Sequence, residues 1–256
     1  MLDYVVTGDV SQITRHLSDL SRRQVPFATA SALTKTAKFV QQKIREEMPR
    51  VFDRPTRYTL NSTWVRAATK ARLWAEVKIK DDLATRAGVV PPIKWLAPQI
   101  YGGSRGHKGF ERALQRIGKM PPGFAVPASS MPRDASGNVS KGQIVKILAD
   151  LQALRDPLDR ATDRSRLRRR RSRTKRAQFY FSTYPVNWRT AHLRPGIYVR
   201  TEFGFGSSIR PVMLFVPAVR YRKRLRFFEI ADQSARMRFP VEFALAMRHA
   251  IATART

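Results

Sequence analysis

The chain has 256 residues, of which 43% are hydrophobic, and it contains no cysteine. This size and apolar content allow one sizeable core, or one core that carries a large insertion. The lack of cysteine excludes disulfide bonds, thiolate metal sites and cysteine nucleophiles. No apolar run reaches about eighteen residues, and the first residues lack a basic region followed by an apolar stretch. We therefore expect neither a transmembrane helix nor a signal peptide.

The charge of the chain is strongly positive: 49 lysine and arginine residues against 19 aspartate and glutamate residues leave a net of +30. Such a chain attracts polyanions, so nucleic acid and the acidic faces of other proteins are both candidate partners. Arginine binds phosphate and carboxylate alike through forked contacts, and its excess therefore does not choose between them. A GC-rich genome would explain an excess of arginine over lysine, but not the net charge.

Two helices are predicted near the N-terminus. Residues 10–23 carry apolar side chains at helical spacing, which indicates a short helix. A second helix is predicted from Pro26 to Pro49, because proline suits a first helical turn and stops a helix further on. Its apolar side chains step by three or four residues and form one stripe: Phe27, Ala30, Leu33, Ala37, Val40, Ile44 and Met48.

A β-hairpin is predicted after these helices. Its second strand is indicated by a period of two, in which Leu73, Ala75, Val77 and Ile79 alternate with the residues between them. The partner strand is expected within residues 58–67, and residues 69–71 would connect the two.

The middle of the chain, residues 81–176, is rich in the proline and glycine residues that punctuate loops. Two short helices are predicted within it, Gly109–Ile117 and Lys141–Leu154, and Ser140 is a suitable N-cap for the second. We interpret this section as an irregular insertion or arm.

A dense basic run closes the middle section. Nine of its thirteen residues are cationic, and it has no acidic residue: Arg164, Arg166, Arg168, Arg169, Arg170, Arg171, Arg173, Lys175 and Arg176. Like charges at this density repel one another, and a run of this kind is usually a solvated surface. Here the density favours contact with a polyanion or an acidic partner, and these nine residues are the predicted binding site.

Strand patterns return in Gln178–Thr183, Gly196–Glu202 and Pro211–Val219, which are rich in aromatic and β-branched residues. Residues 226–256 are predicted to be helical, with a kink or restart at Pro240. The expected apolar face of this helix consists of Phe243, Met247 and Ile251, with Ala244 and Ala250 nearby. The fold class is therefore α+β, with N-terminal and C-terminal helices on one mixed or antiparallel sheet. Residues 1–80 and 177–256 would form the body, and residues 81–176 the insertion.

Residues that could carry catalysis are sparse. His16, His107, His192 and His249 are far apart in the sequence, and the acidic pairs at 46–47 and 81–82 are adjacent, so the two carboxylates of each pair point apart. The glycine-rich segment 102–109 lacks the Gly-Lys-Ser/Thr ending of a phosphate-binding loop. We expect no catalytic residue, metal or cofactor; a metal-dependent nuclease would need carboxylates for Mg²⁺.

Aromatic residues lie among the cations of the C-terminal half. They are Tyr180, Tyr184, Trp188, Tyr221 and Phe227. Basic patches with interleaved aromatic rings can bind single-stranded nucleic acid by stacking. Because most of these rings lie in strand-like segments, we interpret them as core residues instead.

Near the N-terminus, Val25–Ala37 is predicted as an alanine-rich helix that follows a short helix and a proline. Near the C-terminus, a predicted strand ending near Val216-Pro217 is followed by a basic loop and by the helix around Arg238–Ala246. In these two segments the chain resembles the phage minor tail protein Z and tail-completion (neck) proteins. The middle resembles a segment common in phage virion proteins, at 100–105, 110–114 and 137–145.

This resemblance implies a structural virion protein at the head–tail junction, assembled in the host cytoplasm, that joins the portal or adaptor to the tail. The implied partners are the portal, the adaptor, the tail tube or terminator, further copies in a ring (a hexamer), and genomic DNA in its lumen. No membrane and no small-molecule substrate are expected. The alternative is a nucleic-acid-binding protein that contacts DNA or RNA through its basic arm.

Overall fold

The computed structural model describes residues 3–7, 19–81, 90–153, 177–203 and 205–253. Two compact units divide the chain: residues 1–103 with 221–256 form unit 1, and residues 104–220 form unit 2. Helices at both ends and antiparallel sheets confirm the predicted α+β class, although the described residues form three sheets rather than one. The units divide the chain differently from the predicted body and insertion, since residues 177–220 group with the preceding segment.

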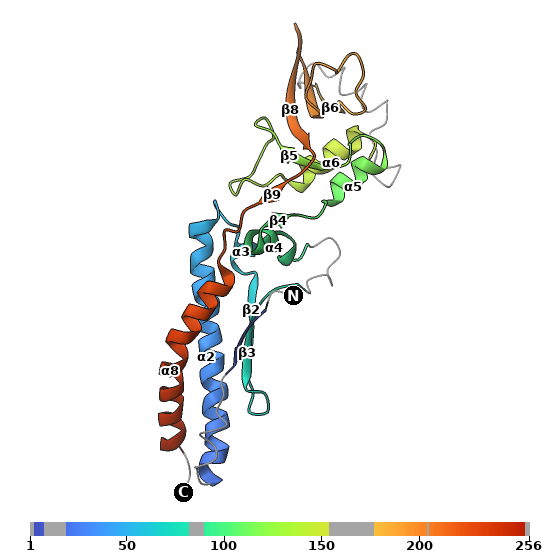
Figure 1. Ribbon diagram of the computed structural model, residues 1–256. Helices are drawn as coiled ribbons and strands as arrows, with labels where there is room; N and C mark the ends of the chain where they lie inside the picture. Colours follow the sequence, from blue (N-terminus) through green and yellow to red (C-terminus); the bar gives the residue numbers. More distant parts are fainter. Residues whose placement is uncertain (1–2, 8–18, 82–89, 154–176, 204, 254–256) are drawn as a thin grey trace. The chain divides into compact units, whose positions relative to one another are not determined.

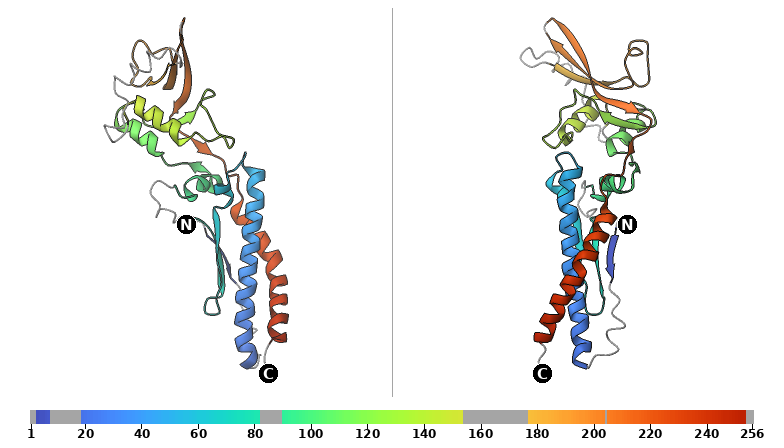
Figure 2. Two further views of the ribbon diagram at one scale, coloured as in Figure 1. Left: turned by 180° about the vertical axis from the view of Figure 1, so that it is seen from behind. Right: turned by 60° about the vertical axis from the view of Figure 1, so that its left-hand side comes forward.

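Unit 1 is built on two long helices, α2 (Asp19–Val51) and α8 (Phe227–Ala252), which run side by side in opposite directions (Figure 1). A three-stranded antiparallel sheet packs against α2, in the order β1 (Asp3–Thr7), β3 (Trp74–Ile79) and β2 (Thr63–Arg66) (Figure 2). Two shorter helices, α3 (Arg57–Leu60) and α4 (Ile93–Tyr101), complete the unit.

The apolar stripe of α2 is buried as predicted, apart from its first residue. Its six other members lie in the core, while Phe27 is exposed with the ammonium of Lys70 5.3 Å from its ring centre. The predicted ends of the helix are wrong, because α2 continues through both Pro26 and Pro49. Proline removes one backbone hydrogen bond, but burial of Val25 and Ala28 on either side of Pro26 favours an unbroken helix.

Helix α8 also continues through its proline, Pro240, so the predicted restart is wrong. Its predicted apolar face is wrong at Ile251 and Ala244, which are exposed. After Phe227, the first residue of α8, the residues buried along this helix are mainly small: Ala231, Ser234, Ala235, Glu242, Ala246 and Ala250. Small side chains let the two helix backbones approach closely, which explains why the largest apolar residues do not mark this face.

The predicted hairpin is confirmed in β2 and β3, where Val65 lies opposite Val77. Ala75, Val77 and Ile79 are buried on the side of the core. The strand β1, which pairs with the other edge of β3, is an addition to the predicted hairpin.

Unit 2 is a four-stranded antiparallel sheet with two helices. Its order is β5 (Phe124–Pro127), β8 (Gly206–Val216), β7 (Gly196–Phe203) and β6 (Ala177–Ser182). Helices α5 (Gly109–Arg116) and α6 (Lys141–Asp150) share one apolar core with this sheet. The segment interpreted as an irregular insertion thus supplies the helical layer of a second core.

Both predicted helices of this segment are present, and the hydroxyl of Ser140 caps α6 by accepting the amide of Gln143 at 3.2 Å. Helix α4 is an addition, since its prolines at 91, 92 and 98 indicate a loop. The two-residue strands β4 (Gly103–Ser104) and β9 (Arg220–Tyr221) pair with each other. None of the helices in the described ranges has the length and apolar character that a membrane crossing demands.

Candidate polyanion-binding site

One face of the unit 2 sheet carries rows of aromatic, cationic and apolar side chains. Helices α5 and α6 share a core with the opposite face, which includes Val199 and Tyr180. Side chains alternate along a strand, so the sequence neighbours of Val199 and Tyr180 point away from the helices. Phe179 on β6 lies opposite Arg200 on β7, which in turn lies opposite Ile209 on β8.

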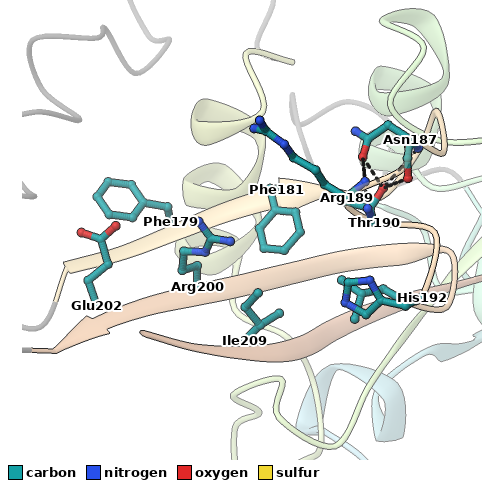
Figure 3. Close-up of a pocket in the computed structure, with 10 residues that line it drawn as sticks. Phe179, Phe181, Asn187, Arg189, Thr190, His192, Arg200, Glu202 and Ile209 are labelled. Atoms are coloured by element: carbon teal, nitrogen blue, oxygen red, sulfur yellow. Dashed lines mark hydrogen bonds between the residues drawn. The ribbon is translucent and has the colours of Figure 1, made fainter. Parts of the chain in front are cut away.

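A second row lies beside the first. It consists of Phe181, Tyr198 and Pro211 on the same three strands. The rings of Phe181 and Tyr198 are stacked with their centres 5.9 Å apart. The guanidinium of Arg200 also lies 5.9 Å from the centre of the Phe181 ring, within the range of a cation–π contact. Figure 3 shows Arg200 between the rings of Phe179 and Phe181.

The connection between β6 and β7 forms one end of the site. Within it, the side-chain oxygen of Asn187 accepts hydrogen bonds from the amides of Arg189 (3.0 Å) and Thr190 (3.1 Å). At its base, the hydroxyl of Thr183 accepts the amide of Gly196 at 2.8 Å. These bonds fix a short turn that presents the indole of Trp188, 81% exposed, with the Arg189 guanidinium 4.8 Å from its ring centre.

Together these elements enclose a groove of about 440 Å³ (Figure 3). Its lining residues come from β6, β7, β8 and the connection: Phe179, Phe181, Asn187, Arg189, Thr190, His192, Leu193, Arg200, Glu202 and Ile209. This volume lies within the range of ligand sites, and the lining combines flat apolar surfaces with cations. We refer to this site as the groove.

The electrostatic balance around the groove is positive. Residues 177–220 contain five arginines and one acidic residue, Glu202, which lies at the end of the groove away from Asn187. Arg189 and Arg200 are both exposed and line it. Guanidinium groups bind phosphate and carboxylate, and aromatic faces stack on flat groups. The arrangement suits a ligand that carries both negative charge and planar rings.

The nine residues of the predicted binding run, 164–176, lie outside the described residues. In the sequence they end directly before Ala177, the first residue of β6. Among the described residues, those that line the groove do not belong to the predicted site.

The glycine-rich segment at 102–109 is held by the chain's own carboxylate. Glu111, fully buried, accepts the amide of Lys108 at 2.6 Å and that of Ala125 at 3.0 Å. The Arg105 guanidinium donates two further bonds to it, at 2.5 and 2.9 Å. The amide of Lys108, the residue before α5, is thus already paired with a carboxylate of the chain itself.

Burial raises the pKa of the Glu111 carboxyl, but the bonds from Arg105, Ala125 and Lys108 lower it by more, so the net pKa lies below the ordinary value. A buried carboxylate with four donors remains ionised and ties the loop, α5 and β5 together. We assign Glu111 a structural role.

The histidines of the described ranges and the acidic pair at 46–47 lie in separate segments of the chain. His107 stacks on Phe124 with ring centres 4.6 Å apart, His192 lines the groove, and His249 is exposed on α8. Glu46 pairs with Lys43 at 2.9 Å on the surface of α2. Within the described ranges, no three histidine or acidic residues gather as a metal site would need; His16 lies outside those ranges.

The expected core role of the aromatic residues is confirmed for two of them. Phe227 is fully buried in unit 1, and Tyr180 packs against the core of unit 2. The expected core role is wrong for Trp188, whose side chain is exposed. Phe179 and Phe181 are the rings that sequence reasoning missed, although alternation around Tyr180 places them together on the opposite face.

Comparison with known proteins found no family model, no curated protein and no solved structure that matches this chain.

Proposed function

We propose that the chain is a structural protein of a phage virion, located at the head–tail junction, where it joins the portal or adaptor to the tail. The observation that carries the proposal is the packing of the two terminal segments on which the resemblance to tail-completion proteins rests. Val25–Ala37 lies on α2 and Arg238–Ala246 lies on α8, and these helices pack along each other.

The contact between the two segments is specific. Ala28 and Ala32 from the first segment form one apolar cluster with Ala246 and Ala250, against which Phe239 and Phe243 pack. On the same helix pair, the buried carboxylate of Glu242 lies 2.6 Å from Arg238 and 3.8 Å from Lys35. Segments about 200 residues apart in the sequence thus form one structural element, as a shared fold would require.

The middle segments of the resemblance are also connected to each other within unit 2. Arg105, from the segment at 100–105, forms its ion pair with Glu111, from the segment at 110–114. Helix α5, which carries Glu111, packs against α6, whose first half belongs to the segment at 137–145. This supports reading them as parts of one unit.

In this proposal the chain is non-catalytic and acts through surfaces and charge. It would assemble as a ring, a hexamer by the resemblance, with the portal, adaptor, tail tube or terminator as neighbours. A ring repeats the net charge of +30 in every subunit, which favours acidic neighbours or the passing genome.

The test is the protein content of purified phage particles. Quantitative mass spectrometry of virions should find the chain at a fixed copy number relative to the portal, and cross-linking should join it to portal or tail proteins. Absence of the chain from intact particles would contradict the proposal.

A second function, nucleic-acid binding, is favoured by the arginine and aromatic side chains of the groove. It is compatible with the first, since a virion protein can contact the genome.

A further inference from the structure

We propose that the groove, together with the exposed ring of Trp188 on the adjoining β6–β7 connection, binds single-stranded nucleic acid, with bases stacked on Phe181 and Trp188 and phosphates paired with Arg189 and Arg200. The proposal rests on the groove and not on a place in the virion, so that either can fail without the other.

The first argument is the position of the rings. Phe181 is partly exposed on a face whose neighbours are Arg200 and Tyr198, and its ring is held by the stack on Tyr198. Trp188 is far more exposed than a ring that serves only packing. Such rings offer a surface to bases that are not already paired and stacked, which a duplex does not provide.

The second argument is the combination of charge with these rings. The guanidinium of Arg189 lies 4.8 Å from the centre of the Trp188 ring, and that of Arg200 lies 5.9 Å from the centre of the Phe181 ring. Each ring therefore has a guanidinium over it, so a base that stacks on the exposed part of the ring would bring its phosphate close to a cation. An acidic protein segment would use the cations but would leave the rings without a partner, so the nucleic acid fits better.

The third argument is the rigidity of the connection that presents Trp188. Hydrogen bonds to Asn187 fix the turn, and the hydroxyl of Tyr198 donates to the carbonyl of Arg194 at 3.0 Å. A fixed turn reduces the entropy that is lost when a ligand binds, as expected of a binding surface.

The experiment measures binding of the full-length chain to a short fluorescein-labelled oligothymidylate by fluorescence anisotropy over a series of salt concentrations. Phe181→Leu and Trp188→Leu should each weaken binding by about tenfold, the loss of one base–aromatic stack. Arg200→Gln should lower the slope of log affinity against log salt by about one. Tyr101→Leu and Arg248→Gln, exposed residues of unit 1, are the matched controls and should behave like the unmodified chain.

Three further ligands separate the alternatives. Heparin carries charge without bases, polyglutamate mimics an acidic protein, and a DNA duplex carries phosphates with stacked bases. The ring variants should leave all three affinities unchanged, because their losses should be confined to unpaired bases. If the ring variants lost as much affinity for heparin or the duplex as for oligothymidylate, the groove would be a general anion site. If they lost as much affinity for polyglutamate, the groove would bind an acidic protein. Either result overturns the proposal.

Photocross-linking of an iodouridine oligonucleotide gives a second measurement that does not depend on the variants. Cross-links should map to peptides that contain Phe181 or Trp188. If both ring variants are folded, bind oligothymidylate like the unmodified chain, and no cross-link falls within 179–200, the groove is not the site.

Discussion

Replacement of Glu111 by glutamine tests the packing of unit 2 at its most constrained point. Four donors converge on this carboxylate: two nitrogens of Arg105 and the amides of Lys108 and Ala125. A glutamine side chain offers one acceptor oxygen, and its amide NH2 group is itself a donor that would face the remaining donors. The variant therefore leaves donors unsatisfied next to an arginine side chain that is only 11% exposed.

Removing one partner of a buried ion pair costs about 3–5 kcal/mol, because the other charge stays buried without compensation. We expect Glu111→Gln to lower the free energy of unfolding of unit 2 by about this amount. The assay is urea unfolding followed by hydrogen exchange and mass spectrometry, with attention to peptides that contain the amide of Ala125. Glu229→Gln is the control, since Glu229 pairs with Lys223 at 2.6 Å on the surface and should change stability little.

The pH dependence of the same site follows from the lowered pKa of Glu111. A carboxyl whose pKa is lower in the folded state binds its proton more readily in the unfolded chain. The ionised Glu111 therefore stabilises the fold fully at pH values above its ordinary pKa of 4.5. This stabilisation should be lost as the pH falls from there through the lower, folded pKa, and the Glu111→Gln variant should lack that part of the acid dependence. Unchanged exchange at Ala125 and an unchanged unfolding midpoint in the variant would show that the Glu111 carboxylate does not stabilise unit 2.

Three further substitutions, one of them with a matched control, test the packing of the two units and the N-cap of α6. Gly196→Ala would place a Cβ 2.4 Å from the carbonyl oxygen of Met213 and should destabilise unit 2 by about 1–3 kcal/mol or more in urea unfolding. Its control is Gly142→Ala on α6, which has open space around it and should be neutral or slightly stabilising in the same assay. Ala32→Leu should cost about 1–3 kcal/mol in thermal or urea unfolding, because Ala32 is fully buried where α2 meets α8, and an unchanged stability would show that the helices are not packed there. Ser140→Ala should cost about 1 kcal/mol by removing the N-cap bond to Gln143, with early exchange of the first amides of α6 as the local readout.

Patterns local to one element were enough to predict several elements of this fold. The stripe on α2 from Ala30 to Met48 and the alternation from Ala75 to Ile79 are both buried as expected. Each pattern follows from the geometry of one helix or one strand and depends little on distant residues. The Ser140 cap was predictable for the same reason.

Features that depend on distant packing were not predictable in this way. The rule for proline at a helix start is local, and it is overridden at Pro26 by burial of Val25 and Ala28. On α8 the buried face contains Glu242 and excludes Ile251, because Arg238 compensates the carboxylate and alanines fill the contact with α2. Hydrophobic periodicity alone cannot identify a face of this kind.

The groove lies between these two cases. The sequence of β6 shows that Tyr180 points to one side of the strand and that Phe179 and Phe181 point to the other. It does not show which of these two sides faces the helices. That orientation decides whether Tyr180 or its two neighbours belong to the core. The pairing of Arg200 with Phe179 depends on the register between β6 and β7, which no single segment encodes.

We propose that this chain is a structural component of a phage virion at the head–tail junction. A cryo-electron microscopy map of the intact particle would show whether the chain lies there. We expect a ring between portal and tail whose density fits the α2–α8 helix pair of each subunit. A junction fully accounted for by other proteins, with no density for this helix pair, would contradict this proposal.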